Sequence, residues 1–508
     1  MQTLYYSTSN WIRHTDNIVD LEQYRRKLSQ AEDHQPAEGP ELIVLPQPSA
    51  PRPRRSQRLR RRALLLDAWA SMGVLVMTLT FALRALAVFA VTLAALFVLL
   101  LAAYALPGEP VRDHVYDSAV KIAGEGLYPE YLNFKLFQMD NYTDTIMLTE
   151  AASADEAPPL TAMMTNTAYN VDNFETLADD LQWYIERDWA AGAQRTDAPA
   201  LVPFSYARYW HGYLIWLRPL LLVTDITGVR VVQYLVLAAL FAAVAVLLRR
   251  RCGLRAAVWF AVSQLLVTAF WAPHQVQFFT CFAVAYAGCV WVLAKPRRSD
   301  DVCLALLVLG VVTSFCDLLV TPVLTLGLPL VCWLLEPQQR LRAGTRQCGI
   351  VVGGSLTWGV GYLLCWASKW VLAGLVTGQN VIADALHQVG VRTAADSWHG
   401  MELTWRNILH FVYTTLAGKH LFWPLVLAVV LLLALFAASI RDRQQLARAL
   451  PLGLCALMTP AWFIVLRTHS IQHGWFTWRA LGLTVFAGLA FLYYCCDVRK
   501  IAKRLKRT

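Results

Sequence analysis

The stretch ALAVFAVTLAALFVLLLAAYAL, residues 85–106, contains no charged side chain and is long enough to cross a membrane as one helix. Roughly 20 apolar residues in a helix span a hydrocarbon core of about 30 Å. The whole chain of 508 residues shares this bias, since 57% of it is hydrophobic and 16% is charged. Soluble proteins average about 45–50% apolar and 25% charged residues. The sequence therefore predicts an integral membrane protein.

Further apolar stretches of similar length follow the first. They lie at 229–248, 255–272, 275–294, 302–318, 319–335, 348–372, 421–440, 449–466 and 478–497. Pro273 with His274 separates the third span from the fourth, and Asp317 with Pro322 separates the fifth from the sixth. Prolines end helices at such points, so we expect tight turns there. The predicted fold is an all-α polytopic membrane protein with about ten transmembrane helices.

Clusters of arginine and lysine predict the orientation, because basic loops resist transfer across the membrane. These clusters fall on alternate loops, at 52–62, 249–255, 295–298, 340–346, 441–448 and 499–507. Alternate loops lie on the same face of the membrane. We expect that face to be cytoplasmic, with both termini on it, in a multi-pass protein of the cytoplasmic membrane. The net charge of +10 sits beside apolar runs, which favours membrane lipids as partners and argues against nucleic acid.

The chain is expected to divide into five segments. These are an Arg/Pro-rich disordered cytoplasmic tail (1–62), an interfacial helix with the first span (63–106), an outer region (107–228), the remaining spans (229–497) and a basic cytoplasmic tail (498–508). The outer region holds 18 of the 35 acidic residues and 7 of the 45 basic ones. Residues 63–83 also have the length of an extra span, but a hairpin there would reverse every later loop.

A pair of aspartates in the outer region is the first candidate for chemistry. Asp140 and Asp144 are four residues apart, so they share one face of a helix or converge across a turn. Two carboxylates so placed suit a general base with its orienting partner, or a divalent cation such as Mg or Mn. A solvated acidic loop is the alternative. Asp113 and Asp117 lie earlier, just after the first span.

Aromatic and cationic residues gather shortly before the second span. Tyr209, Trp210 and His211 are followed by Arg218. Tyrosine and tryptophan at this depth are typical of an interfacial belt. A sugar-phosphate site is the alternative, because aromatic rings stack on sugars while a guanidinium binds phosphate oxygens. Asp317, in the turn between two spans, is either a functional carboxylate or a helix cap.

The segment joining the last two spans carries two histidines and two arginines. His469 and His473 are four residues apart and lie between Arg467 and Arg479. These arginines are on the face that disfavours basic residues, which indicates an anionic partner. A membrane lipid headgroup satisfies this requirement. So does a phosphate or pyrophosphate group held by the arginines and by the imidazoles as hydrogen-bond donors.

This layout resembles the GT-C class of integral-membrane glycosyltransferases, which have a cytoplasmic N-terminus, a long first outer loop with an essential acidic residue and roughly ten spans. Segments 140–144, 209–219 and 469–479 are similar to stretches found in a bacterial group of GT-C-like membrane proteins. The resemblance covers residues 85–497 in layout. In many GT-C enzymes the acidic residue follows the first span closely, which would favour Asp113 or Asp117 over Asp140 and Asp144.

The resemblance implies transfer of a sugar from a polyprenyl phosphate or diphosphate donor to a glycan or protein acceptor of the cell envelope. Asp144 or Asp140 would remove the acceptor proton as the lipid phosphate leaves. The phosphate would be bound by His469, His473, Arg479, Arg467 and Arg218, and the sugar by Trp210, His211, Tyr209 and Asp317. A transporter or lipid flippase, and a non-catalytic envelope assembly protein with the same fold, are the competing interpretations.

Overall fold

A computed structural model of the chain describes residues 55–133, 137–171, 201–316, 318–393, 396–398, 400–411 and 443–497, together with 427 and 430. The chain divides after Leu86 into two units. Helix α3 (Arg55–Tyr104) contributes residues to both. No proline occurs within it, and Pro107 follows its end. The predicted interfacial helix and first span are therefore one continuous helix, which begins inside the segment predicted as a disordered tail.

Within the described residues, seven helices are long and apolar enough to cross a membrane. They are part of α3, α9 (Ile226–Cys252), α11 (Val276–Ala294), α12 (Ser299–Cys316), α15 (Gly344–Thr377), α18 (Arg443–Val465) and the segment Gly474–Cys495, which ends in α21 (Leu481–Cys495). Two shorter apolar helices are α10 (Leu254–Leu266) and α13 (Val323–Leu335). The prediction of an all-α polytopic membrane protein is confirmed. The predicted span 421–440 lies outside the described residues, apart from 427 and 430.

Both predicted breaks between spans are present. The 3-10 turn η4 (Ala269–His274), which contains Pro273, separates α10 from α11. Helix α12 ends at Cys316 and α13 begins at Val323, one residue after Pro322. Proline has no backbone N–H and clashes with the preceding turn, so the apolar runs cannot continue as single helices through these points.

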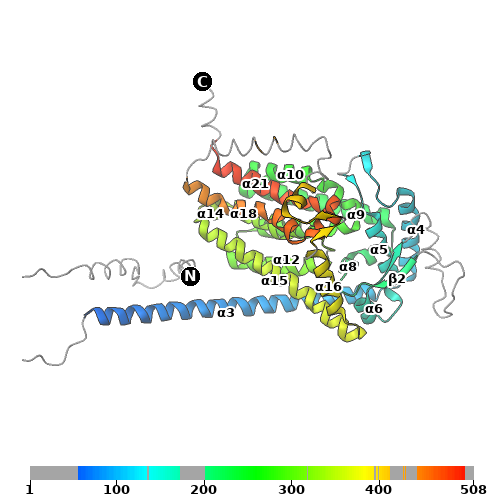
Figure 1. The fold of residues 1–508 in the computed structure, drawn as a ribbon, viewed down its shortest axis with the longest axis horizontal. Helices are drawn as coiled ribbons and strands as arrows, with labels where there is room; N and C mark the ends of the chain where they lie inside the picture. The colour runs from blue at the N-terminus through cyan, green and yellow to red at the C-terminus, as the bar shows by residue number, and fades with distance from the viewer. Residues whose placement is uncertain are drawn as a thin grey trace, which may run out of the picture. The chain divides into compact units, whose positions relative to one another are not determined.

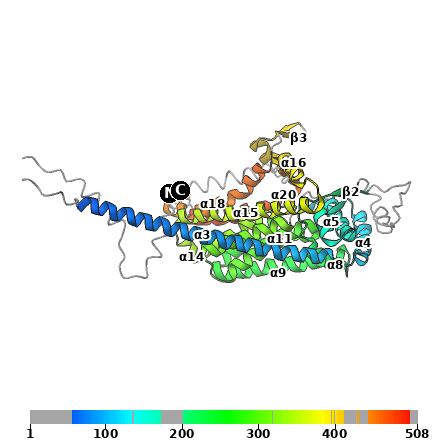
Figure 2. The same cartoon turned by 90° about the horizontal axis from the view of Figure 1, so that it is seen from below.

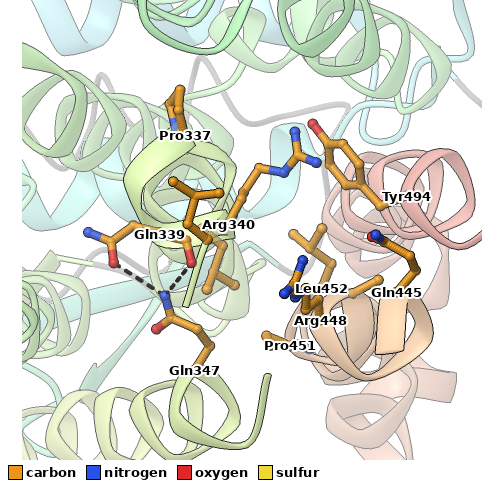
Figure 3. A pocket seen from close by; sticks show the side chains of 12 residues that line it. Pro337, Gln339, Arg340, Gln347, Gln445, Arg448, Pro451, Leu452 and Tyr494 are labelled. Carbon is orange, nitrogen blue, oxygen red and sulfur yellow. Dashed lines mark hydrogen bonds between the residues drawn. The ribbon is translucent and has the colours of Figure 1, made fainter. Parts of the chain in front are cut away.

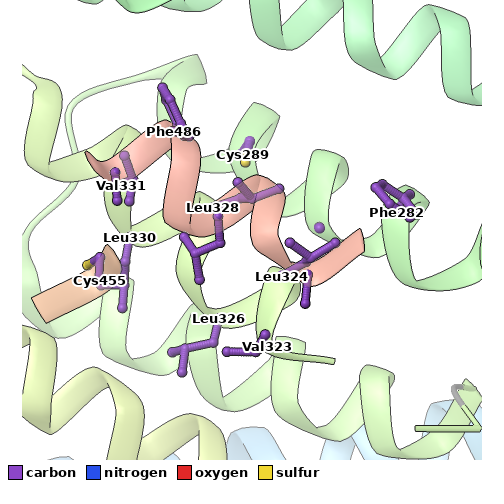
Figure 4. Close-up of a cluster of buried hydrophobic side chains, with 14 of the residues drawn as sticks. Phe282, Cys289, Val323, Leu324, Leu326, Leu328, Leu330, Val331, Cys455 and Phe486 are labelled. Carbon is purple, nitrogen blue, oxygen red and sulfur yellow. The ribbon is translucent and has the colours of Figure 1, made fainter. Parts of the chain in front are cut away.

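The helices α9, α10, α11, α12, α15, α18 and α21 run side by side in a bundle (Figures 1 and 2). Helix α13 lies at its centre, and all its residues are buried. Figure 4 shows Leu324 and Leu328 of α13 among Phe282 of α11 and Phe486 of α21. A helix that is apolar all round is covered either by lipid or by other helices, and other helices bury every residue of α13.

Helices α12 and α15 approach each other closely at two glycines. A β-carbon added at Gly310 would lie 2.2 Å from the carbonyl oxygen of Trp358, and one at Gly361 would lie 2.4 Å from that of Leu307. Small residues let helix backbones pack at short distance, which is the usual way that helices associate within membranes. The pair α12 and α15 thus fixes one wall of the bundle.

Residues 107–133, 137–171 and 201–228 form a folded region at one end of the bundle, seen at the α4, α5 and β2 labels in Figures 1 and 2. It contains α4 (Glu109–Glu125), η1 (Tyr131–Asn133), α5 (Asn141–Ala152), η3 (Ser153–Asp155), α6 (Pro159–Thr165) and α8 (Leu214–Leu221). Strands β1 (Thr167–Val171) and β2 (Leu201–Ser205) pair antiparallel, with Thr167 opposite Ser205. We call this the α5 end of the bundle.

The opposite end carries α14 (Pro337–Arg340) and is called the α14 end. Helix α16 (Val381–Thr393) and the short strands β3 (Ser397–Trp398) and β4 (Met401–Glu402) follow α15. Helices α19 (Arg467–Gln472) and α20 (Gly474–Thr477) and the turn η5 (Trp478–Ala480) link α18 to α21. Helix α19 packs against α16, which brings the predicted histidine segment close to that helix.

Candidate functional site

The aspartate pair lies where α5 meets the first turn of α11. Asp140 is the N-cap of α5, and its carboxylate accepts from the backbone N–H of Thr143 at 3.0 Å and from the Thr143 hydroxyl at 2.7 Å. Its own N–H donates to the side-chain oxygen of Gln275 at 2.9 Å. Asp140 is 3% exposed, and burial raises the pKa of its carboxyl group. The residue thus caps one helix while its backbone binds the residue that precedes α11.

Asp144 caps a different helix from the one that contains it. Its two carboxylate oxygens accept from the backbone N–H groups of Val276 and Gln277, at 3.1 and 3.3 Å, in the first turn of α11. A negative charge at a helix N-terminus is favourable because the N–H groups there have no partner within the helix. Burial raises the pKa of Asp144 to about 7, although these two bonds and the charge of Arg230 oppose that shift. Asp144 therefore fixes α5 to α11.

A buried ion pair supports the same junction. Arg230, in the first turns of α9, donates to both carboxylate oxygens of Glu125 and, through Nε, to the carbonyl oxygen of His274 at 3.0 Å. Asn141 donates to Glu125 at 3.1 Å. Burial alone would raise the pKa of Glu125, but the bonds from Arg230 outweigh it and lower that pKa. Burial and the charge of Arg230 lower the pKa of His274 to about 4.

The predicted histidine segment lies on the other side of the α11 N-terminus. Arg479 is fully buried, and its guanidinium carbon lies 4.7 Å from the ring centre of Phe278 in α11. Phe476 contacts the same ring, with 5.5 Å between centres. The aspartate pair and this segment were predicted from separate parts of the sequence. Both contact the first two turns of α11.

The two histidines face each other, His469 buried and His473 half-buried. Their ring centres are 4.7 Å apart, and Nε2 of His469 lies 2.9 Å from the carbonyl oxygen of Leu319. This contact makes Nε2 the protonated nitrogen of a neutral ring. Burial and the charge of Arg392 lower the pKa of His473 to about 4. Burial, His473 and Arg392 also lower the pKa of His469, so both imidazoles are neutral at neutral pH.

Arg392 connects the histidine segment to the predicted aromatic segment. It lies in the last turn of α16, and its guanidinium donates to the hydroxyl of Tyr209 at 2.5 Å. Tyr209 packs edge-on against His211, with 6.1 Å between ring centres, and against Tyr206, with 5.3 Å. The predicted sugar-binding and phosphate-binding groups therefore share one arginine, which the sequence alone did not single out.

Several buried polar atoms beside this cluster have no hydrogen-bond partner within the described part of the chain. They are Nδ1 of His469 and the hydroxyls of Ser470 and Thr477, all on the histidine segment. Buried polar atoms are almost always paired in proteins, and unpaired ones gathered together indicate that water or a ligand completes them. The site is consequently built to hold something polar.

His211 belongs to a second, fully buried network that sequence reasoning missed. Its Nδ1 lies 2.8 Å from Glu150, which also accepts from the hydroxyl of Tyr213 and from the amide of Asn166 at 3.0 Å. The backbone of His211 has a φ of 55°, a left-handed value that residues other than glycine adopt rarely. Lys369 of α15 donates to Asn166 and to the carbonyl oxygen of Met163 at 2.6 Å. A cavity of about 150 Å³ lies beside Glu150.

The other predicted residues occupy different surroundings. Trp210 is fully buried, donates to the carbonyl oxygen of Cys365 at 2.8 Å and stacks on Phe315. Arg218 is also buried and donates to the carbonyl oxygens of Ala151 and Leu106. Both residues join the α5 end internally. The remaining predicted positions are Asp113 and Asp117, exposed on α4; Arg467, half-buried; and Asp317, outside the described residues.

A metal ion was considered for the aspartate pair. In the part of the chain that the structure describes, no group of three or more His, Cys, Asp or Glu side chains is arranged to hold one.

Comparisons with protein-family models, with curated proteins and with solved structures find no match to this chain. The geometry of the α5 end is therefore the basis for a functional proposal.

Proposed function

We propose that the protein is an integral-membrane glycosyltransferase that takes a sugar from a polyprenyl phosphate or diphosphate donor at the α5 end. The observation that supports this most is the group of buried polar atoms without partners beside Arg479, at the same helix end that Asp140 and Asp144 contact. An acid pair on one side and a cationic, hydrogen-bonding cluster on the other is the arrangement that displacement of a phosphate by a hydroxyl needs.

In this proposal Asp140 is the general base and removes the proton of the acceptor hydroxyl. Asp140 is preferred over Asp144 because one of its two hydrogen bonds comes from the Thr143 hydroxyl, which can rotate away, whereas both oxygens of Asp144 accept from fixed backbone N–H groups of α11. Arg392 and Arg479 stabilise the negative charge that grows on the leaving phosphate, and the neutral His473 donates a hydrogen bond to it. His469, whose N–H donates to the carbonyl oxygen of Leu319, can accept a hydrogen bond from a hydroxyl group through Nδ1. Tyr209 and His211 contact the sugar. Asp144 positions the base by holding α5 against α11.

The donor site is tested with Arg392. We expect Arg392→Gln to weaken binding of polyprenyl-phosphate sugars in nanodiscs by about 10- to 100-fold, since a hydrogen bond to a charged group contributes about 1.5–3 kcal/mol. Arg298→Gln removes the same charge at the α14 end and is the matched control. The wild type should cleave the donor and transfer the labelled sugar to envelope acceptors. Translocation of intact donor would instead identify a flippase or transporter, and binding without cleavage a non-catalytic assembly protein.

We propose further that the protein lies in the cytoplasmic membrane with the α5 end outside and both termini inside. The arginine clusters beside the spans support this orientation. Val202 in β2 is 51% exposed, so Val202→Cys should react with a membrane-impermeant maleimide in intact cells. Arg298→Cys, at the other end, should react only after permeabilisation. The wild-type protein is labelled in parallel, to determine how much of the signal comes from its native cysteines. The reverse pattern would show that the orientation is inverted.

A further inference from the structure

The α14 end of the bundle contains a cavity of about 430 Å³, remote from the α5 end. It lies between α14, the first turn of α15, the first turns of α18 and the end of α21, and Figure 3 shows side chains entering it from each of these. Pockets that bind small molecules measure about 300–1,000 Å³. The space is therefore large enough for a headgroup, and the exposed Leu341 is among its lining residues.

The described lining is basic. Arg340 and Arg448 enter the cavity, and the lining residues within the described part of the chain include no aspartate or glutamate. The guanidinium carbon of Arg340 lies 3.2 Å from the ring centre of Tyr494, so this arginine is held in one position by stacking. Glu336, the residue before α14, forms an ion pair with Arg251 at 2.6 Å. Two arginines thus face a common space from opposite helices.

Buried amides complete the polar part of the lining. Gln347 is 3% exposed, and its Nε2 donates to the carbonyl oxygen of Gln339 at 2.9 Å and to its side-chain oxygen at 3.2 Å (Figure 3). The side-chain oxygen of Gln347 is buried and has no partner within the described residues. It can accept a hydrogen bond from a hydroxyl group. The remaining lining is apolar, with Leu334 and Leu452 among its members.

From this geometry we propose that the cavity binds a phosphate group, carried either by an anionic membrane lipid or by a soluble phosphorylated compound. Arginine is suited to this role because its planar guanidinium donates several hydrogen bonds to phosphate oxygens. A basic pocket between transmembrane helices at headgroup level is a common form of anionic lipid site. The apolar lining and the unpaired oxygen of Gln347 suit a glycerol backbone with a free hydroxyl. This site is separate from the proposed donor site.

The test compares two double variants in phosphatidylcholine nanodiscs titrated with short-chain phosphatidylglycerol. Arg340→Gln/Arg448→Gln should weaken saturable binding by about tenfold or more, because it removes both charged donors. Arg250→Gln/Arg298→Gln removes the same charge from exposed positions outside the cavity and should leave binding within about twofold of wild type. Arg448→Glu alone should also weaken binding. Arg448 is exposed and makes no stacking contact with Tyr494, so this variant tests the site without disturbing that packing.

A second titration with inorganic phosphate distinguishes the source of the group. Binding of phosphatidylglycerol alone identifies a lipid site, and binding of inorganic phosphate with the same dependence on Arg340 and Arg448 identifies a soluble ligand. Equal weakening in the cavity variant and its control would mean that diffuse surface charge attracts the lipid, and the proposal would be wrong. Absence of saturable binding of either compound to the wild type would also overturn it.

Discussion

Asp140→Asn is expected to reduce sugar transfer by about 100-fold or more while leaving the fold intact, since a positioned general base contributes roughly 10²- to 10⁴-fold to rate. Asparagine has the same shape and is as good an N-cap as aspartate. Its side-chain oxygen can still accept from the N–H of Thr143, and the Thr143 hydroxyl can rotate to accept from the new amide. What disappears is the ability to take up a proton.

The pH dependence follows from the same carboxylate. Only the ionised form of Asp140 accepts a proton, and burial raises its pKa above the ordinary 3.8. Transfer by the wild type should therefore fall as the pH drops through that raised pKa. The residual transfer by Asp140→Asn should lack this acid limb. The measurement is the initial rate of transfer from a labelled polyprenyl-phosphate sugar across a pH series, with unfolding temperature recorded for each variant.

Asp113→Asn and Asp117→Asn make the same chemical change at the two aspartates that the family resemblance favours. Both are exposed on α4, and we expect both variants to transfer sugar at close to the wild-type rate, which would exclude them as the base. Asp144→Asn is a poorer test of catalysis. Its new amide would point N–H groups at the N–H groups of Val276 or Gln277, so lost stability would accompany lost activity. Full transfer by Asp140→Asn, or an effect shared with Asp113→Asn, would remove Asp140 from the mechanism.

The membrane spans were predictable because the bilayer imposes a local rule on the sequence. A segment that crosses hydrocarbon must be apolar over its whole length and must satisfy its own backbone hydrogen bonds, so the run itself reveals the helix. Pro273 and Pro322 marked real helix ends for an equally local reason. The continuity of α3 was missed. Charged residues within the first apolar run suggested a break, but without proline they do not interrupt a helix.

The contacts that assemble the candidate site were not predictable in this way. Asp144 caps a helix that begins at Val276, and Arg392 bonds to Tyr209. Such pairings join residues far apart in the chain and have no local pattern. Some signals were present but unused: Lys369 lies inside the predicted span 348–372, and Glu150 follows an apolar run. A charge among apolar residues is costly unless it is paired, so each should have been expected to have a buried partner.

Glu150 is the residue whose loss is expected to destabilise the α5 end most. It is 1% exposed and accepts from three side chains at once, those of Tyr213, His211 and Asn166. Asn166 in turn accepts a hydrogen bond from Lys369, so the network joins α5 and the segment after α6 to α15. All of these side chains are buried. Their mutual bonds are what make burial of so many polar groups tolerable.

Glu150→Leu should therefore lower the free energy of unfolding by about 3–5 kcal/mol, which is typical when one member of a buried charged pair is removed. One N–H of Asn166 would lose its acceptor, and His211 and Tyr213, which lie 3.2 Å apart, could satisfy only one of their two donors by pairing with each other. Glu150→Gln should cost less, because the amide oxygen still accepts from one of them. Asp113→Asn is the surface control and should leave stability within about 0.5 kcal/mol of wild type.

Thermal or denaturant unfolding in nanodiscs ranks the four proteins, and the expected order of stability is wild type with Asp113→Asn, then Glu150→Gln, then Glu150→Leu. The order separates two causes of lost function. If Glu150 took part only in the reaction, Glu150→Gln and Glu150→Leu would abolish sugar transfer without changing stability. If the network holds the site together, donor binding should decline in step with stability, because His211 and Tyr209 pack against each other and Tyr209 accepts from Arg392. Equal stability of Glu150→Leu and wild type would show that the network carries no structural energy.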